Sequence, residues 1–326
     1  MISVAMCSYN GEKYIEEQIK SILAQTVPVD EIVICDDRSN DRTIEIISQI
    51  KGDNTSKTEI CFYVNETNLG VTKNFEKALS LCRGDIVFLS DQDDVWVENK
   101  VEITLDILEK HKNCQLVFTD VYLVDANGED LGKRLWELTN PPVKDTYSIR
   151  DFLGLRFVTG ATVALRKVLL EHTLPIPEYW IHDAWLAANA SVYGDVKSIN
   201  KPLIMYRQHE KNVIGAKKRS LVDQIRYTRV HISDSKQFRT TMKNRFLTLY
   251  ENCMQELSSE EKTAVEKCVE FWKVSENLSE NGKLKGVRTI YRNFCNGNYK
   301  KYNHGIYGAG VDLMILTALQ ESRELG

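Results

Sequence analysis

Short apolar runs alternate with stretches of helical spacing through the first 110 residues. Four runs are typical of buried strands: ISVAMC (2–7), EIVICDD (31–37), EICFYV (59–64) and IVFL (86–89). Between them, apolar residues recur every three or four positions, as Ile15, Ile19 and Ile22 do, which predicts helices. The repeated strand–helix order predicts an α/β fold, with a mostly parallel, doubly wound sheet that carries helices on both faces.

The middle of the chain is less regular. Residues 115–125, 157–166 and 202–212 have the composition of strands. Gly160 lies at a position that favours close approach of another group to the backbone. Residues 126–147 contain two glycines and two prolines, and we expect them to form a loop over the site.

Strand patterns largely stop at Lys217, and helical spacing takes over. The apolar positions at this spacing are Leu221, Ile225, Phe238, Met242, Phe246 and Leu249. Ser258 and Glu261 form a capping box ahead of a further helix. The pattern predicts a C-terminal helical appendage over residues 216–326, after two halves of one sheet domain, 1–110 and 111–215.

Charge is unevenly distributed between these parts. The net charge is −4, but residues 216–326 hold 19 Lys and Arg against 13 Asp and Glu. Within them, residues 283–302 mix six basic residues with Tyr and Phe. This pattern fits either a solvated helix face or a patch that docks on a membrane surface. Residues 305–320 are too short and too broken by glycine to span a bilayer, and we expect a packed terminal helix.

The eight cysteines show no CxxC pair and no metal-ligand spacing with histidine. Several lie inside apolar runs, which indicates reduced core residues and a cytosolic compartment. The first residues lack a basic segment followed by a long apolar one, so no signal peptide is expected. Composition therefore predicts a globular protein of the cytoplasm.

Polar clusters follow three of the predicted strands. They are Ser8 with Asn10, Asp36 with Asp37, and Asp91 with Asp93 and Asp94. Parallel strands end at the same sheet edge, where ligands bind in such folds. The oxygen-only set at 91–94 suits Mg²⁺ or Mn²⁺ shared with substrate phosphates. The alternative is an acidic turn with Asp94 as a helix N-cap. Neither GxGxxG nor a P-loop motif is present.

Four successive motifs carry a resemblance to a known family. They are SVAMCSYNGEKYIEEQIKSILAQT, EIVICDDRSNDRT, NLGVTKNFEKAL and DIVFLSDQDDVW. Over residues 1–210 the chain resembles family 2 glycosyltransferases, which have a GT-A fold with a Rossmann-like sheet. Three further segments, GATVALR, HDAW and MYRQHEKNVIGA, are similar to those of bacterial polysaccharide rhamnosyltransferases. The resemblance makes residues 1–110 the nucleotide-sugar-binding half and 111–215 the acceptor-binding half.

The resemblance implies where the donor binds. Its nucleoside would lie against Cys7, Ser8 and Asn10, with Asp37 accepting a hydrogen bond from the base. Lys73 would offer a cation to the diphosphate and Asn74 a polar contact. Asp37 as a plain turn residue and Lys73 as a plain surface lysine are the alternatives.

The resemblance also implies a metal site. Asp91-Gln92-Asp93 matches the DxD motif, with Asp93 as a direct ligand and Asp91 on the ribose or the metal. Asp94 is either an extra ligand or a positioning group. His209 matches the position of a third metal ligand, although a core histidine at a strand end is equally compatible.

Asp183 matches the catalytic base of the family. Inverting transfer needs one carboxylate to take the proton of the acceptor hydroxyl. The family usually has an acidic residue before this aspartate, and here His182 stands there. A plain helix N-cap is the alternative for Asp183.

These implications predict an inverting, metal-dependent glycosyltransferase of cell-surface polysaccharide biosynthesis. The first candidate donor is dTDP-L-rhamnose, and UDP-hexose or UDP-N-acetylhexosamine is the second. The acceptor would be a glycan or lipid-linked glycan at the cytoplasmic face of the plasma membrane, contacted peripherally through 283–326, and no nucleic-acid partner is expected. A sugar nucleotidyltransferase, a metal-dependent phosphoesterase and a non-catalytic glycan-binding module are the alternative classes.

Overall fold

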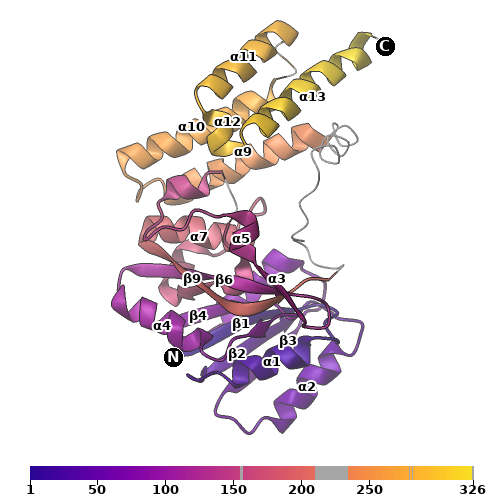
Figure 1. Cartoon of the computed structure of the whole chain (residues 1–326), viewed down its shortest axis with the longest axis vertical. Helices are drawn as coiled ribbons and strands as arrows, with labels where there is room; N and C mark the ends of the chain where they lie inside the picture. The colour runs from indigo at the N-terminus through magenta and orange to yellow at the C-terminus, as the bar shows by residue number, and fades with distance from the viewer. Residues whose placement is uncertain (155–156, 210–233, 279, 281, 325–326) are drawn as a thin grey trace. The chain divides into compact units, whose positions relative to one another are not determined.

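The computed structural model describes residues 1–154, 157–209, 234–278, 280 and 282–324. The chain divides into two compact units (Figure 1). The first consists of Met1–Ser148 and Phe157–Ala216, and the second of Ile149–Arg156 and Lys217–Gly326. The short segment 149–156 thus leaves the sheet unit and joins the helical one.

The first half of the sheet unit has the predicted strand–helix alternation. Its strands are β1 (Ile2–Ser8), β2 (Glu31–Asp36), β3 (Glu59–Val64) and β4 (Ile86–Ser90). They lie in the order β3-β2-β1-β4, and all three pairings are parallel. The intervening helices are α1 (Ile15–Leu23), α2 (Thr43–Asp53) and α3 (Val71–Leu81). The prediction of a mostly parallel, doubly wound arrangement is confirmed here.

The second half of the sheet is mixed. Its elements are β5 (Val95–Trp96), α4 (Lys100–Lys110), β6 (Cys114–Val124), β7 (Asp130–Arg134), β8 (Ala164–Arg166), α7 (His182–Tyr193) and β9 (Asp195–Arg207). β6 and β9 pair in parallel, whereas β8 runs antiparallel to both β4 and β6. β5 pairs antiparallel with β9, and β7 with β6.

Two local predictions are wrong in this half. The segment 126–147 is not only a loop, because it contains β7 and helix α5 (Leu135–Thr139). In 157–166 only Ala164–Arg166 is a strand, since Gly160–Thr162 forms a 3₁₀ turn closed by the Val163 N–H and the Gly160 carbonyl (2.9 Å). The strand placed at 202–212 begins earlier, at Asp195, and its last three predicted residues lie outside the described part.

Short elements connect the rest of this region. They are the 3₁₀ turns Ile149–Phe152 and Lys167–Leu169 and the helix α6 (Leu170–Thr173).

Helices cover both faces of the sheet. Every residue of β2 is buried, which is the pattern of a strand covered on two sides. Val4 and Met6 of β1 belong to one core cluster with apolar residues of α1, α2 and α4. Ala5 between them points to the opposite face, and α3 packs against β1 and β2 there. Burial on both faces leaves the strand ends as the exposed route to the sheet.

The second unit is helical in its described residues. Its helices are α9 (Asp234–Cys253), α10 (Ser259–Glu276), α11 (Lys283–Cys295), α12 (Asn298–Tyr302) and α13 (Ile306–Glu324). The Ser258–Glu261 capping box is present, as predicted. Leu221 and Ile225, also predicted to be helical, lie outside the described residues.

The predicted packed terminal helix is α13. Its buried Asp312 accepts hydrogen bonds from Arg239 (2.5 Å) and from the Tyr299 hydroxyl (2.6 Å), which ties α13 to α9 and α12. Among the described helices, none combines the length and the apolar character that a bilayer span requires.

Candidate active site

The acidic turn 91–94 lies at the carboxyl end of β4, as predicted. The strand before it is fully buried, so the turn starts from a rigid base. Asp94 does not cap a helix, because β5 follows it directly and α4 begins only at Lys100, with Asn99 as its N-cap. The N-cap alternative for Asp94 is therefore wrong.

His209 lies against this turn. Its Nε2 and Asp93 Oδ2 are 2.8 Å apart, although 116 residues separate them in sequence. The antiparallel pairing of Val95 with Met205 brings the end of β9 to the turn. The His209 ring also stacks on Tyr14, with centroids 5.4 Å apart. The structure thus brings together two predicted metal ligands, and their ligand role stays a prediction.

Arg207, the last residue of β9, forms hydrogen bonds with the same turn. Its backbone N–H donates to Asp94 Oδ1 (3.2 Å), and its Nε donates to the Asp93 carbonyl (2.9 Å). Its guanidinium pairs with Glu17 (2.6 Å) and lies over the Tyr14 ring. Sequence reasoning did not give Arg207 a role, although an arginine at the end of an apolar strand pattern was a signal. The structure shows that it is buried.

Asp94 is the most enclosed of the three acids. It is buried, and its Oδ2 has no hydrogen-bond partner among the described residues. Burial, followed by the charges of Asp93 and Asp91, raises its pKa well above the usual value. The hydrogen bond and the charge of Arg207 offset this rise only in part.

Asp91 connects the turn with Asp183. Burial, and then the charges of Asp93 and Asp183, raise the pKa of Asp91 to about 7. The same carboxylates act on Tyr206. Its pKa is raised by burial and then by the charges of Asp91, Asp94, Asp93 and Asp183. The predicted base and the predicted metal ligands therefore share one electrostatic environment.

Asp183 lies in the first turn of α7, where the helix dipole favours a carboxylate. It is buried, and its Oδ1 accepts from the Ala184 N–H (2.5 Å). The N-cap of α7 is Ile181, so the alternative that Asp183 is a plain N-cap is wrong.

His182, the residue before the predicted base, lies in surroundings that favour its neutral form. It is buried and stacks on Phe75 of α3 with centroids 4.1 Å apart. Burial lowers its pKa despite the nearby Asp183. A Cβ added at Gly160 would lie 2.6 Å from His182 Nε2, so only glycine fits, and the predicted close approach is confirmed.

These acids fit a divalent cation. The partnerless Asp94 oxygen and the raised pKa values of Asp91 and Asp94 indicate negative charge that the protein itself compensates only in part. Carboxylates with one imidazole suit Mg²⁺ or Mn²⁺. Asp93, Asp91, Asp94 and His209 are the residues that could hold such an ion.

At the first two strand ends, the predicted nucleoside contacts join the loops to each other. Ser8 Oγ donates to Asp36 Oδ2 (2.7 Å). The Asn10 N–H donates to Ser39 Oγ (2.8 Å), and the Asn40 N–H donates to Asn10 Oδ1 (2.9 Å). Cys7 is half-buried, and burial raises its thiol pKa. These contacts hold the loops after β1 and β2 together, and the nucleoside-binding role of their residues stays a prediction.

Asp37 holds the loop that precedes α3. Its Oδ1 accepts from the Leu69 N–H (2.7 Å) and from Asn65 Nδ2 (2.9 Å), and its Oδ2 accepts from the Gly70 N–H (2.8 Å). Asp37 is thus more than a turn residue, and its contact with the base stays a prediction.

Lys73 and Asn74 already have protein partners. Asn74 is buried; its amide donates to the Cys35 carbonyl (2.8 Å) and accepts from Asn65 (2.9 Å). Lys73 Nζ donates to Glu76 (2.7 Å) and to the Ile176 carbonyl (2.8 Å). Their donor-binding roles remain predictions, and Asn74 in particular has a structural task.

Gln92 is a site residue that sequence reasoning missed. Its amide forms two hydrogen bonds with the backbone of Tyr9, from the Tyr9 N–H (2.8 Å) and to the Tyr9 carbonyl (3.0 Å). A Cβ at Gly11 would lie 2.2 Å from Gln92 Oε1. Gln92 therefore fixes the loop after β1 to the acidic turn, and its place between two aspartates was the available signal.

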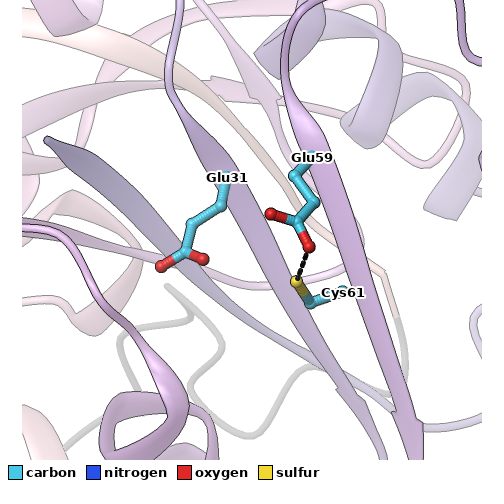
Figure 2. A group of neighbouring side chains, drawn as sticks. All are labelled: Glu31, Glu59 and Cys61. Carbon is cyan, nitrogen blue, oxygen red and sulfur yellow. Dashed lines mark hydrogen bonds between the residues drawn. The ribbon is translucent and has the colours of Figure 1, made fainter.

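A second acidic group lies at the opposite edge of the sheet. The ligand atoms of Glu31, Glu59 and Cys61 are within 4.8 Å of one another, and Figure 2 shows the Cys61–Glu59 hydrogen bond (3.4 Å). Arg83 supplies the positive charge here, through a hydrogen bond from its Nε to Glu31 (2.7 Å) and a contact with Glu59. This group is a protein ion-pair cluster that needs no added cation.

Comparison with known proteins places this site in a family. The profile described as "Glycosyl transferase family 2" matches residues 3–174. The chain belongs to glycosyltransferase family 2, and it is a hexosyltransferase. The family resemblance drawn from the four motifs is confirmed.

Among curated relatives, the chain is 30% identical over 251 residues to the "dTDP-rhamnosyl transferase RfbG" of Shigella flexneri. The match covers 72% of this chain and 81% of that protein. A "putative teichuronic acid biosynthesis glycosyltransferase TuaG" of Bacillus subtilis is 32% identical over 133 residues, 41% of this chain and 51% of that protein.

Solved structures show the fold. TarS residues 1–349 of S. aureus has a TM-score of 0.60 at 15% identity, covering 98% of this chain and 91% of that one. The mannosyltransferase PcManGT of Pyrobaculum calidifontis, in complex with GDP-Man and Mn²⁺, has a TM-score of 0.53 at 16% identity, with 97% and 86% coverage. The predicted GT-A fold is confirmed.

Proposed function

We propose that the chain is an inverting, metal-dependent glycosyltransferase. It moves L-rhamnose from dTDP-L-rhamnose onto a cell-surface polysaccharide, of the capsule or cell wall, or onto a lipid-linked glycan. The observation that carries the proposal is the shared electrostatic environment of the 91–94 turn and the buried Asp183. The relative named as a dTDP-rhamnosyl transferase supports this donor.

Asp183 acts as the general base. The acceptor oxygen attacks the anomeric carbon, its proton passes to an Asp183 carboxylate oxygen, and the bond to the diphosphate breaks. The β-linked donor then yields an α-linked rhamnoside. The neutral His182 ring adds no charge that would compete with Asp183.

The acidic turn serves the leaving group. Asp93, Asp91, Asp94 and His209 would hold Mg²⁺ or Mn²⁺, and such an ion would supply positive charge to the nucleoside diphosphate leaving group. We also expect Asp91 to contact the ribose if it does not bind the metal. PcManGT, a neighbour in fold, is in complex with Mn²⁺, which supports metal use without deciding between the two ions.

The donor lies across the three strand ends. Cys7, Ser8, Asn10 and Asp37 line the nucleoside side. Lys73, whose side chain is 44% exposed, would exchange its contacts with Glu76 and the Ile176 carbonyl for the diphosphate. Asn74 contributes through the loop that it holds.

A UDP-hexose or UDP-N-acetylhexosamine donor is the second candidate. A structure of TarS 1–349 in complex with UDP-GlcNAc has a TM-score of 0.56 to this chain. Membership of the family favours either transferase over a nucleotidyltransferase, a phosphoesterase or a glycan-binding module. The protein would act in the cytoplasm, peripherally on the inner face of the plasma membrane, where a lipid-linked acceptor is found.

A thermal-shift panel tests the proposal. We expect dTDP-L-rhamnose with Mn²⁺ to raise the melting temperature more than dTDP-glucose, UDP-glucose or UDP-GlcNAc, and EDTA to abolish the rise. Stabilisation by a UDP-sugar alone would replace the rhamnose donor with the second candidate. A response independent of metal would contradict the role of the acidic turn.

A further inference from the structure

Helix α11 of the second unit exposes a row of large apolar side chains. Leu284, Val287, Tyr291 and Phe294 are 79%, 38%, 69% and 45% exposed. Their spacing of three, four and three residues places them on one side of the helix. We call these four residues the α11 stripe. Such a continuous apolar row on a surface marks a site of interaction.

The buried side of α11, next to the stripe, is anchored within its own unit. Gly286 and Ile290 are its buried residues, and α11 packs against α13. A Cβ added at Gly286 would lie 2.7 Å from Leu316 Cδ2, so the two helices are in close contact. The α11 stripe is therefore not the core face of this helix, and core packing does not explain it.

Cations border the stripe on one side. Lys285, Arg288 and Arg292 follow the same helical spacing and are exposed. From Glu280 to Asp312 the chain holds six Lys and Arg residues and no Asp or Glu between these two acids. Two of these six residues, Lys300 and Lys301, extend the charge onto α12, and both are exposed.

We propose that α11 lies flat on a membrane and binds anionic phospholipid headgroups. An interfacial helix sinks an apolar side to the acyl boundary and directs its basic side chains to the headgroups. A second copy of the chain fits less well, because a symmetric contact between two stripes would bring two rows of cations together. This inference deepens the proposed peripheral membrane contact, rests on it, and assigns it to one helix.

Vesicle binding without donor or acceptor provides the test. The full chain is sedimented with vesicles of phosphatidylcholine alone or mixed with phosphatidylglycerol. We expect binding to the anionic vesicles that weakens with salt, and little binding to the neutral ones. Equal binding to both, or binding to neither, would overturn the inference.

Paired variants locate the contact. Arg288→Gln with Arg292→Gln should weaken partitioning about 25-fold, since each basic residue near an anionic surface contributes about fivefold. Lys267→Gln with Lys273→Gln on α10 changes the charge equally and should have less than a twofold effect. Leu284→Gln with Tyr291→Gln should lose at least about tenfold, against no change for the exposed Leu247→Gln on α9. Equal losses in test and control pairs would overturn the assignment to α11.

Two controls separate this inference from its rivals. If sedimentation shows a dimer that Leu284→Gln with Tyr291→Gln dissociates, the stripe is an interface between copies and the inference fails. Donor binding with Mn²⁺ and no lipid should be unchanged in all four variants. In the wild-type chain, absence of vesicle binding with intact donor binding would contradict this inference alone, whereas vesicle binding without any donor binding would contradict the proposed function alone.

Discussion

Acidic side chains lie both where the parallel strands begin, which we call the amino edge of the sheet, and where they end, which we call the carboxyl edge. The charges of the two groups are compensated differently. At the amino edge, the buried Glu31 and its neighbour Glu59 both pair with Arg83. At the carboxyl edge, Asp94 keeps an oxygen without a partner, and the pKa of Asp91 rises to about 7. Arg207 stands beside that edge, but its guanidinium pairs with Glu17.

The difference separates structural acids from functional ones. Where a protein cation compensates the carboxylates, the cluster is complete and stabilises the fold. Where protein cations compensate the carboxylates only in part, the unpaired charge lowers the stability of the folded protein. A bound cation can relieve this destabilisation. Substitutions at the two edges should therefore affect activity and stability in opposite ways.

The largest effect is expected at the base. Asp183→Asn should lower the rate of transfer by about 10²–10⁴-fold, because the acceptor proton loses its receiving carboxylate. Donor affinity should be retained, since Asp183 serves the acceptor side. Product formation with a labelled donor measures this, and Glu59→Gln at the amino edge is the matched control. Transfer within a few-fold of the wild type would remove Asp183 from the mechanism.

The next effect concerns the metal. Asp93→Asn should weaken nucleoside diphosphate binding in Mn²⁺ by about 100-fold or more, since even the loss of a hydrogen-bonding partner of a metal ligand costs about 10–100-fold. In EDTA the variant and the wild type should bind equally weakly. Titration calorimetry gives both values, with Asp106→Asn, an acid in an exposed ion pair with Lys110, as the control. Undiminished binding in Mn²⁺ would contradict the role of Asp93.

At the amino edge the expected loss is in stability. Glu31→Ala should lower the free energy of unfolding by about 2–3 kcal/mol, because the buried carboxylate accepts from Ser3 and twice from Arg83. Urea unfolding measures it, and Glu45→Ala in an exposed pair should leave the midpoint unchanged. Loss of transfer in the folded Glu31 variant would break the proposed division between the edges.

The smallest predicted effect is a gain in stability rather than a loss. Asp91→Asn should stabilise the chelated protein at pH 8, because burial, Asp93 and Asp183 raise the pKa of Asp91 from 3.8 to about 7 and so penalise its ionised form. The full shift corresponds to about 4 kcal/mol, and the partial exposure of the side chain reduces the expected gain to about 1–2 kcal/mol.

The pH dependence gives the check. The gain should grow from about pH 4 to pH 7 and then level off, because the folded wild type keeps the proton on Asp91 below its pKa. Thermal unfolding across this range measures it. A destabilised Asp91→Asn protein at pH 8 in EDTA would show that Asp91 is compensated, as Glu31 is.

Much of the fold could be predicted because its cause is local. The strand patterns of residues 2–89 and the helical spacing between them imply parallel strands that end at one edge. The capping box at Ser258 and the tight approach at Gly160 were also predictable from neighbouring residues. The mixed half was harder, since a three-residue strand such as β8 exists only through its pairing with β4 and β6.

The sequence was enough to select candidate site residues, but it did not predict which groups surround them. Asp37 and Asn74 were both predicted as donor contacts, and the structure shows them engaged with the loop 65–70. Gln92 and Arg207 were missed because their roles are hydrogen bonds to distant backbone, at Tyr9 and at the acidic turn. Such contacts depend on which segments meet, and no local pattern encodes them.

Periodicity, strand ends and residue chemistry were enough to predict that carboxylates gather where the parallel strands stop, and to single out Asp183. They could not distinguish Glu31, which Arg83 compensates, from Asp91 and Asp94, which nothing in the described chain fully does. That distinction arises from long-range pairing, which takes Arg83 to one edge and brings His209 to Asp93 at the other. The periodicity of side chains follows from local backbone geometry, whereas the balance of charge at a site depends on every segment that folding brings there.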